Sequence, residues 1–82
     1  MVEIFFGDNF TKTFSQIKDQ LTKIKIRKQI QKLRANPTAG KPMRHERKGT
    51  RELYIKPFRL SYVYISSEDR IVLWDLYHKK KQ

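Results

Sequence analysis

The chain contains no cysteine, which excludes disulfide bonds and metal sites built from thiolates. Its two histidines are not accompanied by cysteines or by carboxylates at ligand spacing, so we expect no metal site and no cofactor. Long apolar runs are also missing. No window approaches the ~18 apolar residues of a membrane helix, and the N-terminal residues lack the basic region of a signal peptide. We therefore expect a single cytoplasmic domain spanning residues 1–82.

Acidic residues are scarce relative to basic ones. Eight Asp and Glu oppose nineteen Lys and Arg, which gives a formal net charge of +11 on 82 residues. Such a field attracts polyanions, and nucleic acid is the most abundant large polyanion in a cytoplasm. Binding to RNA or to the ribosome is the favoured interpretation. A surface that only confers solubility, or one that meets an anionic membrane, is the alternative, and a protein this basic also favours an acidic protein partner.

The N-terminal half has the pattern of one short strand and two helices. Residues 2–6 are of β type, and Asp8 or Asn9 can cap the helix that follows. A residue before proline disfavours the α conformation, so Asn36-Pro37 ends the second helix. A break near residues 21–22 and one bent helix are both compatible with the pattern. Apolar residues recur at helical spacing at Phe10, Phe14, Ile17 and Leu21, and again at Ile26, Ile30 and Leu33.

After a loop at residues 36–42 the periodicity changes to that of strands. The last strand is apolar on both sides, so it should be central, with Trp74 in the core. The order β-α-α-β-β-β-β predicts an α+β fold, an antiparallel sheet of four to five strands with the two helices packed on one face. The other face is where a ligand would bind. The expected strands span residues 43–48, 51–56, 58–65 and 70–77.

Alternation along the strands selects the side chains of that open face. Arg59 stands between two apolar residues, and its planar fork of donors suits bidentate binding of a phosphate. An ion pair with Glu52 on the neighbouring strand is the alternative. If the apolar residues Leu53, Ile55, Phe58, Leu60 and Tyr62 point to the helices, the open face carries Glu52, Tyr54, Lys56, Arg59 and Ser61.

Candidates for proton transfer are few. His78 follows an apolar strand and precedes three lysines, and histidine titrates near neutrality; a frayed, exposed histidine is the alternative. Tyr54 and Tyr77 can stack on bases or donate hydrogen bonds, or they can be ordinary strand residues. No nucleophile–base–acid triad and no Gly-rich phosphate loop can be assembled. The chemistry that fits is metal-free RNA cleavage, in which the substrate's own 2′-hydroxyl attacks the adjacent phosphorus.

The stretch RELYIKPFRLSYVYISSEDRIVLWDLYHKKKQ, residues 51–82, resembles the RelE/ParE toxin superfamily. The shared pattern is an alternating strand, a break, an aromatic-Arg-Leu-x-Tyr strand, an acidic turn, a hydrophobic strand and a short basic or histidine-containing end. The stretch GKPMRHERKG, residues 40–49, is similar to the Gly-Lys-Pro…Leu-Lys-His…Gly stretch of YoeB-type members. The most specific part is Phe58-Arg59-Leu60 with Tyr62.

The resemblance implies the toxin of a type II toxin–antitoxin pair, whose relatives cleave mRNA in the ribosomal A site and are blocked by an antitoxin. Arg59 matches the strand arginine that contacts the scissile phosphate. His78 matches the near-terminal histidine that acts as general acid or base in YoeB-type members. Arg44 matches a basic residue of the first strand after the helices, and Lys79 or Lys80 falls where RelE has a catalytic arginine.

The chain departs from these relatives at several positions. Glu52 and Tyr54 stand where RelE has two lysines, and the glutamate of YoeB falls near Lys41. No tyrosine follows His78, so the C-terminal tyrosine of the family is missing here. Tyr77 or Tyr54 would have to substitute for it. The catalytic set is therefore less defined than the family.

The sequence thus predicts a ribosome-dependent mRNA endoribonuclease toxin, neutralised by a cognate antitoxin. Its catalytic residues would be Arg59 on the scissile phosphate and His78 in proton transfer, side by side near the C-terminal end, with Lys80 and Glu52 as further candidates. Two alternatives remain: a ParE-like inhibitor of DNA gyrase, and a non-enzymatic RNA- or ribosome-binding protein. The mRNA and ribosomal RNA would be held by Arg44, Arg51, Tyr54, Lys56, Lys79 and Lys81.

Overall fold

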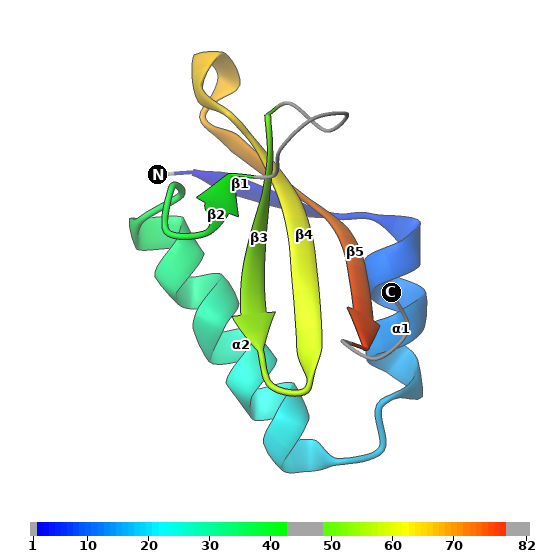
Figure 1. Ribbon diagram of the computed structural model, residues 1–82. Coiled ribbons are helices and arrows are strands. Elements are labelled where there is room, and N and C mark those ends of the chain that lie inside the picture. The colour runs from blue at the N-terminus through cyan, green and yellow to red at the C-terminus, as the bar shows by residue number, and fades with distance from the viewer. Residues whose placement is uncertain (1, 43–48, 79–82) are drawn as a thin grey trace.

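The computed structural model describes residues 2–42 and 49–78. Five strands form one sheet in the order β1-β5-β4-β3-β2 (Figure 1). Together with two helices the sheet makes the expected α+β fold. β4 matches its predicted range, whereas the strand expected at residues 43–48 lies outside the described residues. The elements are β1 (Glu3–Phe6), α1 (Asp8–Gln16), α2 (Gln20–Ala35), β2 (Lys41–Pro42), β3 (Thr50–Ile55), β4 (Phe58–Ile65), the 3-10 helix η2 (Ser66–Glu68) and β5 (Arg70–His78).

The sheet is mixed rather than wholly antiparallel. The pairs β2–β3, β3–β4 and β4–β5 are antiparallel, as consecutive strands with short connections are. β1 pairs parallel with β5. In the described part of the chain, α1, α2, η2 and three strands lie between these two, so no hairpin sets the direction of β1. Because β1 and β4 flank β5, the central place expected for the last strand is confirmed.

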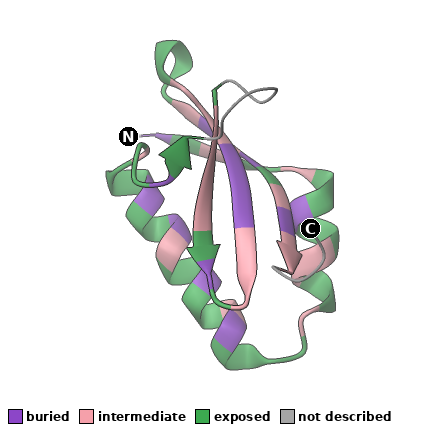
Figure 2. Ribbon diagram, in the orientation of Figure 1, coloured by how far each residue is buried: buried purple, intermediate pink, exposed green. Residues whose placement is uncertain are grey.

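One hydrophobic core fills the space between the helices and one face of the sheet. Figure 2 shows buried positions recurring along α2, as its predicted apolar stripe requires. Leu21, in contrast, is 72 % exposed, because the chain breaks at residues 17–19 and α2 begins in a new phase. Within the described residues, neither helix is long and apolar enough to cross a membrane. The buried core includes Phe10, Ile26, Ile30, Leu33, Ile55, Leu60, Tyr62, Ile71, Leu73 and Leu76.

The start of α1 differs from the expected one. Gly7 occupies the cap position, and neither Asp8 nor Asn9 caps the helix with its side chain. The cause is a close approach to the sheet: Gly7 N donates to Leu73 O at 2.9 Å, and a Cβ on Gly7 would lie 2.6 Å from the same oxygen. Tertiary contact with β5 therefore requires glycine at this helix start.

Asp19 caps α2, and this cap leads to a first prediction. Its carboxylate accepts hydrogen bonds from Leu21 N at 3.1 Å and from Thr22 Oγ1 at 2.7 Å. The bond from Thr22 is the main cause that holds the pKa of Asp19 below its usual value. A lowered pKa stabilises the fold above the ordinary aspartate pKa, and the contribution is lost as the pH falls through the lowered value.

Asp19→Ala is therefore expected to lower the melting temperature at neutral pH. The decrease in melting temperature should be smaller when the pH approaches about 3, where the carboxylate of the parent becomes protonated. Thermal melts followed by circular dichroism at several pH values measure this. Asp8→Ala, which removes a carboxylate of the first turn of α1 that makes no cap bond, is the matched control. A loss for Asp19→Ala that does not change with pH would contradict the role of the ionised cap.

A β-bulge changes the phase of β5. Tyr62 pairs with Leu73, but the preceding residue Ser61 pairs with Asp75, which leaves Trp74 as an extra residue on β5. Odd-numbered residues of β5 face the core before the bulge, and even-numbered ones face it afterwards. The expectation that Trp74 lies in the core is wrong: it is 54 % exposed, on the face of the sheet away from the helices.

Candidate functional site

Polar side chains gather on the open face of the sheet. The residues that separate them along each strand are leucines and other apolar residues that face the core. Alternation therefore directs the polar side chains away from the helices. The register forms two adjacent rows, Lys41-Glu52-Ser61-Asp75 and Tyr54-Arg59-Tyr77, which we call the open-face cluster.

Glu52 is the centre of the open-face cluster. Its Oε1 accepts a hydrogen bond from Arg59 Nη1 at 2.9 Å, which forms an ion pair, and its Oε2 accepts one from the Tyr77 hydroxyl. The side chains of Arg59 and Glu52 are 29 % and 20 % exposed, so solvent reaches the pair but does not surround it. Of the two interpretations of Arg59, the ion pair is the one formed in the structure. An RNA phosphate would have to share Arg59 with this carboxylate.

The three bonded groups have complementary chemistry. A carboxylate can accept a proton, a phenol can donate one, and a guanidinium stabilises negative charge that develops on a phosphate. Tyr54 is the register partner of Arg59 and is half exposed on the same face. Glu52, Tyr54 and Arg59 were all predicted to share this face, and the structure brings them together.

His78 lies on the opposite side of the sheet, so the expectation that it stands beside Arg59 is wrong. Its register partner is Phe58, and the two rings meet edge to face with centroids 5.6 Å apart. The bulge at Trp74 is the reason. An extra residue reverses the alternation of β5, so Tyr77 reaches the open face and His78 turns to the side of Phe58. Both residues line a depression of about 580 Å³ beside the connection between α1 and α2.

The remaining predicted site residues are dispersed. Arg51 points to the helix side, where its Nη1 donates to the carbonyl oxygens of Gly40 at 2.8 Å and of Thr38 at 3.2 Å. Arg51 thus secures the loop before β2. Lys56 is exposed in the turn between β3 and β4, at the end of the open-face cluster. The predicted RNA contacts Arg44, Lys79 and Lys81, and the candidate catalytic Lys80, lie outside the described residues.

Lys41 and Asp75 belong to the open-face cluster although they were not among the predicted site residues. β2 has only two residues, so no alternation could reveal that Lys41 would pair with Glu52. Asp75 follows the bulge, which no local pattern announced. Within residues 2–42 and 49–78, no three His, Asp or Glu side chains are grouped so as to hold a metal ion.

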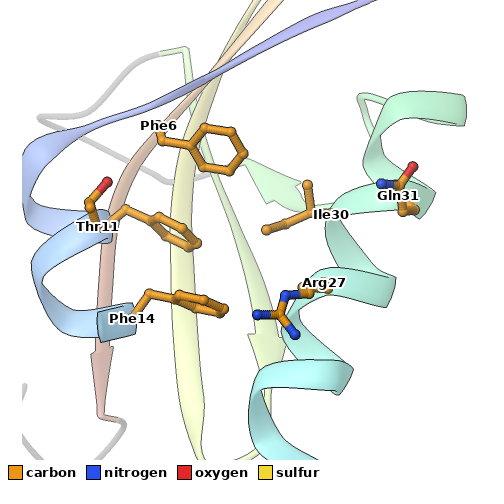
Figure 3. Close-up of a pocket in the computed structure, with 7 residues that line it drawn as sticks. Phe6, Thr11, Phe14, Arg27, Ile30 and Gln31 are labelled. Atoms are coloured by element: carbon orange, nitrogen blue, oxygen red, sulfur yellow. The ribbon is translucent and has the colours of Figure 1, made fainter. Parts of the chain in front are cut away.

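A second surface feature is an apolar groove between α1 and α2, with a volume of about 540 Å³ (Figure 3). The rings of Phe6 and Phe10, and those of Phe10 and Phe14, have centroids 5.8 and 5.6 Å apart. Lys23 Nζ and the Arg27 guanidinium lie 5.2 and 5.4 Å from the centre of the Phe14 ring. The groove therefore has an aromatic wall and a cationic rim, on the side of the sheet opposite to the open-face cluster.

Residues 7–82 match the family model described as the ParE toxin of the type II toxin–antitoxin system parDE. The chain belongs to this toxin family. The match covers nearly the whole chain and includes the aromatic-Arg-Leu-x-Tyr strand, so the resemblance to the RelE/ParE superfamily is confirmed. No curated protein sequence matches this RelE/ParE-family chain significantly.

Solved structures of superfamily members share the fold. A chain of the RelBE2 toxin–antitoxin complex from Mycobacterium tuberculosis has a TM-score of 0.81 at 21% identity, covering 96% of this chain and 94% of that one. A chain of the intact E. coli RelBE complex has a TM-score of 0.80 at 10% identity, covering 95% and 96%. The isolated E. coli RelE toxin has a TM-score of 0.80 at 12% identity, covering 100% and 88%. At these identities the similarity shows the fold alone.

Proposed function

We propose that this RelE/ParE-family toxin is a ribosome-dependent endoribonuclease that cuts mRNA and thereby inhibits translation in the cytoplasm. The observation that carries the proposal is the carboxylate of Glu52, held between the guanidinium of Arg59 and the hydroxyl of Tyr77. The net charge of +11 favours a polyanionic substrate such as mRNA, and it also favours binding of the protein to ribosomal RNA. Lys56 lies at the end of the cluster, where it can contact the RNA backbone.

The open-face cluster supplies each step of cleavage by the substrate's own 2′-hydroxyl. Glu52 takes the proton of this hydroxyl as its oxygen attacks the adjacent phosphorus, and Arg59 turns to the phosphate and stabilises the added charge. Tyr77 gives its proton to the 5′-oxygen that leaves. The products are a 2′,3′-cyclic phosphate and a 5′-hydroxyl end. The proton then returns from Glu52 to Tyr77 along their hydrogen bond, and His78 takes no part.

A second candidate function is inhibition of DNA gyrase by protein binding, without RNA chemistry. The observation that favours it is the ion pair, since Arg59 is already matched by a carboxylate in the free protein. The description of the matched family names parDE. In that case the open face would be a protein-binding surface, and its polar rows would provide specificity rather than catalysis.

Induction of the gene with two parallel readouts separates these functions. Primer extension detects new 5′ ends within mRNAs, and gel analysis of the chromosome detects double-strand breaks that depend on gyrase. We expect mRNA cleavage, which purified protein should reproduce only when ribosomes are present. Chromosome breaks with intact mRNA would contradict the endoribonuclease and support the gyrase inhibitor. Harmless expression with neither effect would leave a non-enzymatic RNA- or ribosome-binding protein.

The partner that we propose is a cognate antitoxin. Two structures with this fold, RelBE2 and RelBE, are those of toxin–antitoxin complexes. The groove between α1 and α2 offers an aromatic wall to the apolar side of an antitoxin helix, and Lys23 and Arg27 offer positive charge to its acidic side. An acidic, amphipathic segment complements both features.

Phe6→Glu is expected to weaken antitoxin binding at least about tenfold, because it places a charge in the aromatic wall of the groove. Isothermal titration with the purified antitoxin measures the affinity. Leu21→Glu is the matched control, since Leu21 is exposed on α2 but does not line the groove. If both variants bind the antitoxin equally well, the antitoxin docks elsewhere.

A further inference from the structure

Trp74 is a large apolar side chain that the cleavage scheme does not use. A tryptophan within a central strand would normally bury its ring, and burial of an aromatic ring stabilises a small domain considerably. The bulge instead turns Trp74 out of the core and toward the face of Asp75, so that the residue is 54 % exposed. The fold thus forgoes burial of its only tryptophan.

The indole lies next to the open-face cluster. Trp74 precedes Asp75, whose register partner is Ser61, and Arg59 is two residues from Ser61 along β4. At a rise of about 3.3 Å per residue, the row of Asp75 lies roughly 7 Å from that of Arg59, and Trp74 is one residue further along β5, at about 7–10 Å. A nucleotide whose phosphate is bound by Arg59 therefore has a neighbouring base within reach of the indole.

We infer that Trp74 is a stacking platform for an RNA base adjacent to the phosphate bound by Arg59, which makes the open face a binding site for single-stranded RNA. This inference rests on the proposed function. Every base has a flat aromatic face, so stacking on an exposed indole holds RNA without selecting one sequence. The net charge of +11 attracts the backbone of the same strand.

The stacking contact can be observed directly, because Trp74 is the sole source of tryptophan fluorescence. A short single-stranded RNA with 2′-O-methyl groups cannot be cleaved, since its attacking hydroxyls are blocked. Titration of the full chain with this RNA is expected to quench the tryptophan emission. Fluorescence anisotropy shows at which RNA concentration the protein is fully bound. Unchanged tryptophan emission at that concentration would overturn the inference.

Substitution provides the second arm of the test. Trp74→Leu is expected to weaken binding of the 2′-O-methyl RNA about tenfold, whereas Trp74→Phe restores most of it because a ring is retained. With cleavable mRNA on ribosomes, Trp74→Leu should raise KM and leave kcat nearly unchanged. Leu21→Ala, an exposed apolar residue on the other side of the molecule, is the matched control and should bind as the parent does.

The outcomes separate this inference from the proposed function. If the parent cleaves mRNA and Trp74→Leu binds RNA as tightly as the parent, the stacking role is wrong while the endoribonuclease stands. If the parent never cleaves but its emission is quenched by RNA and Trp74→Leu loses affinity, the platform stands and the nuclease falls. A Trp74→Leu variant that binds RNA normally but loses the antitoxin or gyrase would assign the indole to a protein contact and overturn the inference.

Discussion

Replacing Arg59 with alanine is expected to slow RNA cleavage by about 10²- to 10³-fold and to abolish toxicity, because Arg59 is the guanidinium of the cluster and stabilises the charge that develops on the phosphate. The fold should survive, since the side chain lies outside the hydrophobic core and Glu52 keeps its hydrogen bond from Tyr77. Arg59→Lys retains the charge without the planar fork and should be intermediate. Single-turnover cleavage of ribosome-bound mRNA and growth after induction measure both variants.

Arg70 is a close match to Arg59 and serves as its control. It also lies on the open face, and its Nη1 forms an ion pair with Glu68 Oε1 at 2.9 Å. It is at the far end of β5 from the open-face cluster, so Arg70→Ala should cleave nearly as fast as the parent. Equal losses in the two variants would indicate a general effect of charge. Parental toxicity of Arg59→Ala would refute the proposed site.

Tyr62→Phe is expected to lower the free energy of unfolding by about 1–3 kcal/mol, because it leaves the buried Gly40 amide and the partly buried Pro37 carbonyl without this hydrogen-bond partner. The Tyr62 hydroxyl donates to Pro37 O at 2.9 Å and accepts from Gly40 N at 2.8 Å. The residue is completely buried. A loss of this size is a large part of the roughly 5–15 kcal/mol that stabilise a domain.

The same hydroxyl predicts a dependence on pH. Burial raises the pKa of Tyr62, although the bond from Gly40 and the charge of Arg51 oppose the shift. A raised pKa means that the neutral phenol stabilises the folded state fully below the ordinary tyrosine pKa, and that this contribution is lost as the pH rises through the raised value. The difference in stability between the parent and Tyr62→Phe should therefore narrow above about pH 10.

Urea denaturation near neutral pH and near pH 10.5 tests both statements about Tyr62. Tyr64→Phe removes the same atom from a half-buried tyrosine of the same strand and should cost less. If Tyr62→Phe is as stable as the parent, the hydroxyl does not hold the loop. This loop leads into β2, which pairs Lys41 with Glu52, so the hydroxyl of Tyr62 also supports this edge of the open-face cluster.

The sequence by itself determined the class of fold and the main surfaces. The apolar stripe of α2 and the range of β4 depend on periodicities of 3.6 and 2 residues, which are local properties of the chain. The same alternation correctly placed Glu52, Tyr54 and Arg59 on one face. The short pattern around Arg59 identified the superfamily, since the order of elements and the motif agreed.

Only the tertiary structure decided which groups meet. An extra residue at Trp74 reverses the alternation of β5. As a result Tyr77, and not His78, lies beside Arg59. The parallel pairing of β1 and the pairing of Lys41 with Glu52 likewise join segments that are distant or too short to carry a pattern. Alternation counts residues along one strand, whereas a bulge and a register are set by packing between strands, so the composition of the site could not be read from spacing alone.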